Sequence, residues 1–129
     1  MLKGIILSLV IGYLAGWILE FSYRSYESKK FIKPLFIDCQ MYALIGAFLY
    51  VLYFWDIFMI YKIILIIFFT TYIEFLTGYL ALKFKKVRLW DYSEEFMNYE
   101  GLICPRFSFY WLVISLLCYY FLIPLISLL

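Results

Sequence analysis

Four long apolar segments constrain this chain more than any other feature of its sequence. They cover residues 2–23, 35–55, 57–82 and 107–128. Because about 20 apolar residues in helical form cross the hydrocarbon core of a bilayer, we predict four transmembrane helices. The second and third segments meet at a tight turn around Trp55 and Asp56, which predicts an antiparallel hairpin.

The composition supports a membrane environment. Hydrophobic residues make up 67% of the 129 residues and charged residues only 16%, whereas soluble domains are about 45–50% apolar and about 25% charged. A chain this small cannot hide so much apolar surface from water, which excludes a soluble monomer. No linker-like tract divides the sequence. We therefore expect residues 1–129 to form one all-α transmembrane bundle.

Basic residues indicate how the chain is oriented. Nine of the eleven Lys and Arg residues fall in or beside the connections at residues 24–33 and 83–106, and only Lys3 and Lys62 lie on the other side. Cytoplasmic loops carry an excess of Lys and Arg. We therefore predict a protein of the cytoplasmic membrane with both connections inside the cell and both termini outside.

Missing residue types narrow the function. The chain has no His, which removes the usual general base and the commonest zinc ligand. It has no Gly-rich phosphate loop followed by Lys, so it does not hydrolyse ATP by itself. A net charge of +2 is too small to indicate nucleic-acid binding. We predict no metal site, no cofactor and no catalytic residue.

Ionisable side chains gather in the cytoplasmic half of the predicted membrane spans. A charge at mid-helix costs about 2.5–3.5 kcal/mol to insert, so such groups are paired or line a wet cavity. In one interpretation they form ion pairs, Glu20 with Arg24 and Glu74 with Arg106 or Arg24. In the other they line a pocket, open to the cytoplasm, that binds a substrate, an ion or a lipid head group. We favour the pair for Glu20 and a functional role for the deeper Glu74, while Asp38 serves either the pocket or the start of its helix.

The connection at residues 90–101 also allows two interpretations. Its Trp and Tyr residues suit an interfacial turn, because these side chains prefer the depth of the lipid head groups. Alternatively, the segment is a re-entrant lid whose Asp91, Tyr92 and Asn98 face the pocket. The candidate substrate- or ion-binding residues are therefore Glu20, Arg24, Asp38, Glu74, Trp90, Asp91, Tyr92, Asn98, Arg106 and Ser108.

Small residues predict a helix-contact face in the first span. Gly12 and Gly16 lie four residues apart, which places them on the same helical face and lets another helix approach closely. This face serves either the bundle itself or contact between protomers, so we expect a homo-oligomer or a partner membrane subunit.

A weak internal similarity is compatible with two parallel helical hairpin repeats. Residues 12–15 and 78–81 share the sequence Gly-Tyr-Leu-Ala, and Cys39-x-x-Tyr42 has a counterpart in Cys104-x-x-Phe107. Short apolar identities also arise by chance, and we favour chance here.

Several of these residues together resemble a known family. They are Glu20-x-x-x-Arg24-Ser25, Cys39-x-x-Tyr42, Glu74, Trp90-Asp91-Tyr92-Ser93, Asn98-x-x-Gly101-x-Ile103 and Ser108-x-x-Trp111. In this pattern the chain resembles the bacterial CmpB-like proteins, a family described as putative ABC-transporter type IV. The resemblance implies a small multispan membrane protein and, for any ATP-driven step, a separate ATPase subunit. It brings no substrate with it.

Three hypotheses for the function follow. The first is a permease-like or transporter-associated subunit that uses the inner polar cluster as its binding site. The second is a structural or regulatory membrane protein whose charges only fix helix packing. The third, a membrane-embedded enzyme acting on lipid with Glu74 or Asp91 as base, is the weakest, because no nucleophile–base pair is visible.

Overall fold

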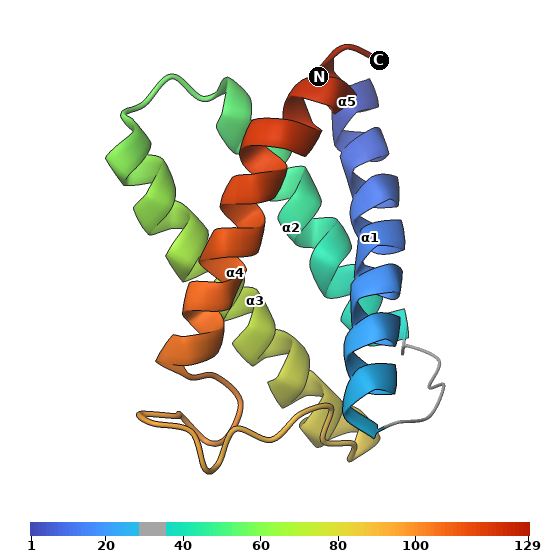
Figure 1. The fold of residues 1–129 in the computed structure, drawn as a ribbon, viewed down its shortest axis with the longest axis vertical. Helices are drawn as coiled ribbons and strands as arrows, with labels where there is room; N and C mark the ends of the chain where they lie inside the picture. Colours follow the sequence, from blue (N-terminus) through green and yellow to red (C-terminus); the bar gives the residue numbers. More distant parts are fainter. Residues whose placement is uncertain (29–35) are drawn as a thin grey trace.

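In the computed structural model the chain runs up and down as an all-helical bundle, with both termini at one end (Figure 1). The structure describes the backbone of residues 1–28 and 36–129, and the side chains of residues 1–26 and 39–129. No strand occurs in these described parts. The helices are α1 (Leu2–Ser28), α2 (Phe36–Phe54), α3 (Met59–Lys85) and α4 (Pro105–Leu117), the last continued by a π-helical turn (Cys118–Leu122) and α5 (Ile123–Ser127).

The observed helices follow the predicted apolar segments closely, and the differences lie at their ends. α3 extends beyond the predicted end, to Lys85. It ends there because Lys86 takes a left-handed conformation (φ 54°) and donates its N–H to the carbonyl of Ala81. α4 begins earlier than predicted, at Pro105, which suits a first helical position because an N–H there has no helical partner.

Three of the helices are apolar and long enough to cross a membrane: Leu2–Tyr26, Met59–Lys85 and Pro105–Ser127. The described apolar part of α2, Cys39–Phe54, is shorter. A count of four membrane spans therefore remains a prediction, and the two hairpin repeats remain an alternative to chance similarity.

Close helix contact joins α1 to α2, the pair that packs most extensively. A Cβ atom added at Gly12 would lie 2.7 Å from the backbone oxygen of Tyr42, and one at Gly16 would lie 2.5 Å from the Tyr42 Cβ. One added at Gly46 would lie 2.8 Å from the backbone oxygen of Ser8. The small-residue face of α1 thus lies against α2 of the same chain, at a distance that only glycine allows.

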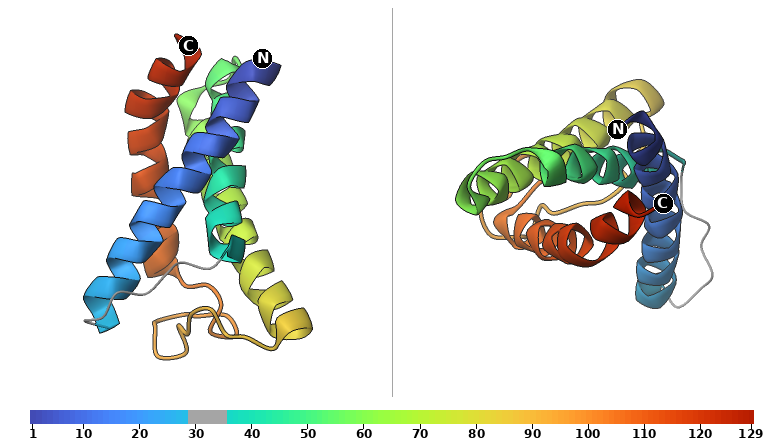
Figure 2. Two further views of the ribbon diagram at one scale, coloured as in Figure 1. Left: turned by 90° about the vertical axis from the view of Figure 1, so that its right-hand side faces the viewer. Right: turned by 90° about the horizontal axis from the view of Figure 1, so that it is seen from above.

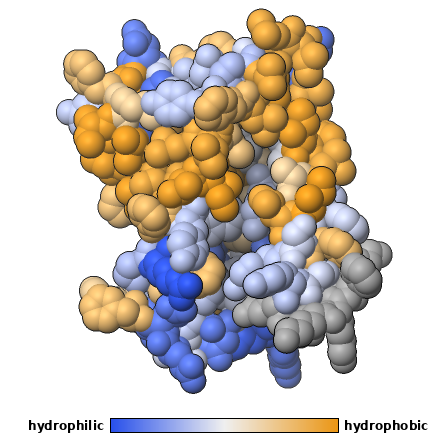
Figure 3. Space-filling view, viewed as in Figure 1, coloured by the Kyte–Doolittle hydropathy of each residue, from blue (hydrophilic) through white to orange (hydrophobic). Residues whose placement is uncertain are grey.

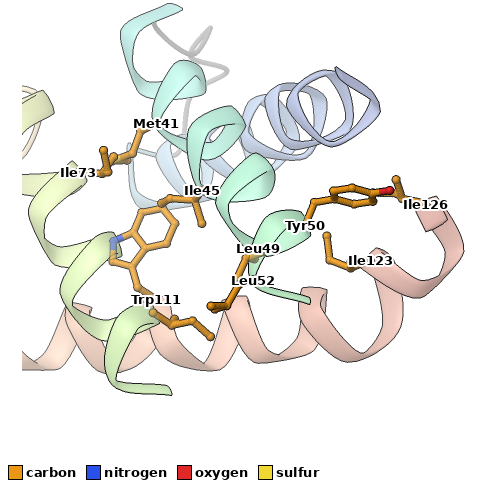
Figure 4. Close-up of a cluster of buried hydrophobic side chains, with 10 residues drawn as sticks. Met41, Ile45, Leu49, Tyr50, Leu52, Ile73, Trp111, Ile123 and Ile126 are labelled. Carbon is orange, nitrogen blue, oxygen red and sulfur yellow. The ribbon is translucent and has the colours of Figure 1, made fainter. Parts of the chain in front are cut away.

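The buried core surrounds α2. Its Met41, Ile45, Leu49 and Leu52 face side chains from the other helices, among them Trp111 of α4 (Figure 4). Seen from above, α4 and α5 lie across from α2 and α3, and α1 closes one side (Figure 2).

On the face shown in Figure 3, apolar residues cover much of the surface towards the end that carries the termini, and polar ones gather at the opposite end. Large apolar side chains are exposed on the outer faces, for example Val10, Phe68 and Phe121. An apolar exterior of this kind fits a lipid environment. The polar end is the one that contains the candidate site.

Candidate functional site

A cavity of about 480 Å³ lies at the polar end of the bundle, with walls from α1, α2, α3, α4 and the connection after α3. This volume is in the range of small-molecule sites, about 300–1,000 Å³. Of the described residues, six acidic and basic side chains line it: Glu20, Arg24, Glu74, Asp91, Glu95 and Arg106. Seven aromatic side chains from the same described part also line it: Tyr23, Tyr42, Trp90, Tyr92, Phe107, Tyr110 and Trp111.

Glu74 is the deepest of these acids, with only 2% of its surface exposed. Its Oε2 accepts two hydrogen bonds, from the indole Nε1–H of Trp111 (2.8 Å) and from the hydroxyl of Tyr92 (3.1 Å). Its Oε1 is buried and has no hydrogen-bond partner among the described residues. Burying a polar atom without a partner costs free energy, so this oxygen is a place where a bound molecule would be stabilised.

Glu20 and Arg24 form the predicted ion pair one helical turn apart on α1. Arg24 Nε donates to Glu20 Oε2 at 3.0 Å, and the hydroxyl of Tyr42 donates to the other carboxylate oxygen at 2.7 Å. Arg24 also donates from Nη2 to the backbone oxygen of Leu89 (3.0 Å). The pair therefore connects α1 both to α2 and to the connection at residues 86–104.

Arg106 does not pair with Glu74, which corrects the ion-pair interpretation for that acid. Arg106 Nη1 lies 3.1 Å from Glu95 Oε1, and its Nε donates to the hydroxyl of Tyr110 at 2.9 Å. The Arg106 side chain is 60% exposed, so pairing with the loop acid avoids the cost of taking a guanidinium into the bundle. Among the described residues Glu74 makes no ion pair.

Hydrogen bonds hold the connection after α3 in a fixed shape. The Asn98 amide donates to the backbone oxygens of Ser93 and Glu95 and accepts from the N–H of Gly101. Gly101 has φ +70°, which glycine adopts without strain. The side chain of Asn98 thus shapes this segment, and Asn98 is not among the residues that line the cavity.

The same connection places three predicted residues at the cavity. Trp90, Asp91 and Tyr92 all line it, and the indole of Trp90 donates to the backbone oxygen of Leu102 (2.8 Å). The N–H of Ser93 bonds Asp91 Oδ1 and holds the pKa of this exposed carboxyl below its ordinary value. Burial, together with the neighbouring Glu74 charge, raises the pKa of Tyr92, so this phenol stays protonated and acts as a donor.

Of the two remaining predicted residues, Ser108 lies away from the cavity and Asp38 cannot be placed. The Ser108 hydroxyl forms a hydrogen bond with that of Thr71 (2.8 Å), which joins α4 to α3, and Ser108 does not line the cavity. The side chain of Asp38 lies outside the described residues.

Tyr42, Trp111 and the loop acid Glu95 line the cavity but were not among the site residues predicted from the sequence. Trp111 and Tyr42 carry polar tips inside apolar segments, and buried Trp and Tyr usually need a hydrogen-bond partner. That rule could have linked them to the buried carboxylates. Nothing in the sequence marks Glu95 as the partner of Arg106. In the part of the chain that the structure describes, no three Cys, Asp or Glu side chains gather as a metal site would require.

The helices and this polar site define a class of protein: an all-helical chain with apolar spans and a cavity at one end of the bundle fits a multi-pass membrane protein. The sequence model of the family described as putative ABC-transporter type IV matches residues 7–129. The chain belongs to this family, as the resemblance in its motifs predicted. No curated protein and no solved structure matches the chain.

Proposed function

We propose that the chain is a permease-like or transporter-associated subunit that crosses the cytoplasmic membrane four times and binds a substrate in the cavity from the cytoplasmic side. Membership of the transporter family and the three long apolar helices support a membrane role. The connection that lines the cavity follows a basic run at residues 83–88. The positive-inside rule assigns such a run to the cytoplasm.

The observation that carries the proposal is the state of Glu74. A carboxylate that fixed helix packing through an ion pair would have a cation beside it, and Glu74 has none among the described residues. Its Oε2 accepts two hydrogen bonds, whereas its Oε1 is buried with no partner in the described part of the chain, beside a cavity large enough for a small molecule. A substrate that donates a hydrogen bond to Oε1 would complete the hydrogen bonding of the Glu74 carboxylate.

Four spans are few for a transporter that alternates between two open states. We therefore propose that the subunit acts in an assembly, with a second copy or a partner membrane subunit, and that a separate ATPase supplies any ATP-driven step.

The experiment fills the cavity and tests function and folding separately. Ile114 lines the cavity, whereas Val113, the preceding residue of α4, is 41% exposed. Ile114→Trp should abolish complementation of the phenotype caused by gene deletion, with a melting temperature close to wild type. Val113→Trp, the matched control, should complement fully. Full complementation by Ile114→Trp would contradict the proposal.

A second variant separates binding from packing. Glu74→Gln keeps the shape of the side chain and the hydrogen bonds from Trp111 and Tyr92. If Glu74 binds substrate, this variant melts like wild type and fails to complement. If the site's charges only fix packing, Glu74→Gln complements the deletion and melts at a lower temperature than the wild type.

A further inference from the structure

We propose that the ligand of this cavity is an organic cation, an ammonium or a similar N–H cation that carries an apolar group. The inference rests on the proposed function and deepens it, because it names the chemistry of the substrate. It depends on the charges that line the cavity, on the aromatic side chains around them and on a smaller apolar cavity that adjoins it.

Among the described residues, one acid that lines the cavity has no basic partner. Four acids and two arginines of this described part line the cavity, which gives a formal charge of −2. Glu20 is paired with Arg24, Glu95 with Arg106, and Asp91 with Arg88, which lies at 3.7 Å. The remaining negative charge belongs to Glu74. Glu74 is also the acid whose Oε1 is buried and has no donor in the part of the chain that the structure describes.

The residues around Glu74 suit a cation. Aromatic ring faces carry partial negative charge and attract ammonium and guanidinium groups. Tyr42 and Trp111 pack together with their ring centroids 4.9 Å apart, and Tyr92 stacks on Phe107 at 4.3 Å. Trp111 and Tyr92 are also the two donors to Glu74 Oε2. The rings of Trp111 and Tyr92 therefore lie beside the carboxylate whose Oε1 has no donor among the described residues.

A second, smaller cavity of about 50 Å³ adjoins the first between α1, α2 and α4. The two cavities share Leu19, Tyr42, Trp111 and Ile114. The lining of the smaller cavity is mainly apolar, apart from Ser8 and Ser115, whose buried hydroxyls have no partner among the described residues. An apolar group attached to the cation would lie against the residues that the two cavities share.

Other ligand chemistries fit less well. An anion would meet the unpaired Glu74 carboxylate, while both arginines in the cavity are already paired with acids. A hard metal cation takes six or more oxygen ligands, and no cluster of acids suited to a metal occurs among the described residues. Aromatic side chains around one carboxylate favour an organic cation over an anion and over a metal ion.

The test compares probes of the same shape and different charge. Purified full-length protein in lipid nanodiscs is titrated by calorimetry with 2-phenylethylammonium, with neutral 2-phenylethanol and with anionic 3-phenylpropanoate. The ammonium probe should bind at least tenfold more tightly than the alcohol, and the anion more weakly than either. In Glu74→Gln the preference for the ammonium over the alcohol should disappear.

Two variants control for charge and folding. Glu94→Gln removes one negative charge from the same connection, at an exposed residue that does not line the cavity, and should leave the preference intact. If Glu74→Gln fails to fold, Glu74→Asp keeps the charge on a shorter arm and should retain a reduced preference.

The outcomes distinguish the ligand class from the proposed function. Equal binding of ammonium and alcohol, both lost in Ile114→Trp, would overturn the cation inference and leave the cavity as a binding site. Tighter binding of the anion would overturn it too, as would no measurable binding of the ammonium probe. The complementation test with Ile114→Trp decides the proposed function independently of all three results.

Discussion

Replacing Tyr92 with Phe removes a single hydroxyl from the contact between the connection after α3 and the bundle. The variant keeps the ring and its stacking on Phe107, and deletes the 3.1 Å hydrogen bond to Glu74 Oε2. A hydrogen bond to a charged group contributes about 1.5–3 kcal/mol. Because this one is longer than the short bonds usual between a hydroxyl and a carboxylate, we expect the low end, a loss of about 1.5 kcal/mol.

The assay is equilibrium unfolding in mixed detergent micelles, read by circular dichroism. Tyr99→Phe is the matched control, because Tyr99 belongs to the same connection and is 57% exposed. It should change the free energy of unfolding by less than about 0.5 kcal/mol.

A double-mutant cycle then tests the partner. In a Glu74→Gln background the acceptor is neutral, and a hydrogen bond to it contributes only about 0.5–1.5 kcal/mol. Tyr92→Phe should therefore cost less there than in the wild type. Equal costs of Tyr92→Phe and Tyr99→Phe, or the same cost of Tyr92→Phe in both backgrounds, would refute the contact between Tyr92 and Glu74.

Three other predictions follow from the fold and the loop. Gly16→Ile should destabilise the protein by about 1–3 kcal/mol, because its side chain would overlap the Tyr42 ring, whereas Leu14→Ile on the exposed face of α1 should not; equal melting temperatures would contradict the close contact. A membrane-impermeant maleimide applied to intact cells should label Leu128→Cys and not Lys86→Cys. The wild-type chain is the background control, because its Cys39 and Cys104 are buried. The reverse labelling pattern would overturn the predicted orientation. Because burial raises the pKa of Tyr92, the native state keeps the phenol proton at a pH where the unfolded chain loses it. The free energy of unfolding should therefore fall above about pH 10, and it should fall less in Tyr92→Phe. Identical pH profiles would show that Tyr92 does not contribute to this pH dependence.

The helices could be predicted because each depends on a local pattern. A run of about 20 apolar residues can be read from the sequence, and so can a basic flank. The start of α4 at Pro105 was not predicted, because Pro105 lies outside the continuous apolar run. The face of α1 with Gly12 and Gly16 could be predicted in the same way, because residues four apart share a face. Which helix packs against that face could not be predicted, since the same spacing serves contact within a chain and between chains.

The partners of Glu74 and Arg106 depend on contacts between distant segments. Trp111 and Glu74 are 37 residues apart in the sequence. The indole reaches the carboxylate only because α3 and α4 pack side by side. Glu95 reaches Arg106 only because Asn98 and Gly101 fold the connection back on itself. Depth in the membrane identified Glu74 as unusual, but opposite charge alone suggested the wrong partner for it.

The central claim is that Glu74 holds a bound molecule in a cavity at the polar end of the bundle. An experimental structure of the wild-type protein, purified with native lipid and without added ligand, tests it most directly. We predict density larger than a water molecule within hydrogen-bonding distance of Glu74 Oε1, bordered by Tyr42 and Trp111. A collapsed cavity in which an arginine lies against Glu74 would contradict the account, and would show that the carboxylate only fixes the packing of the helices.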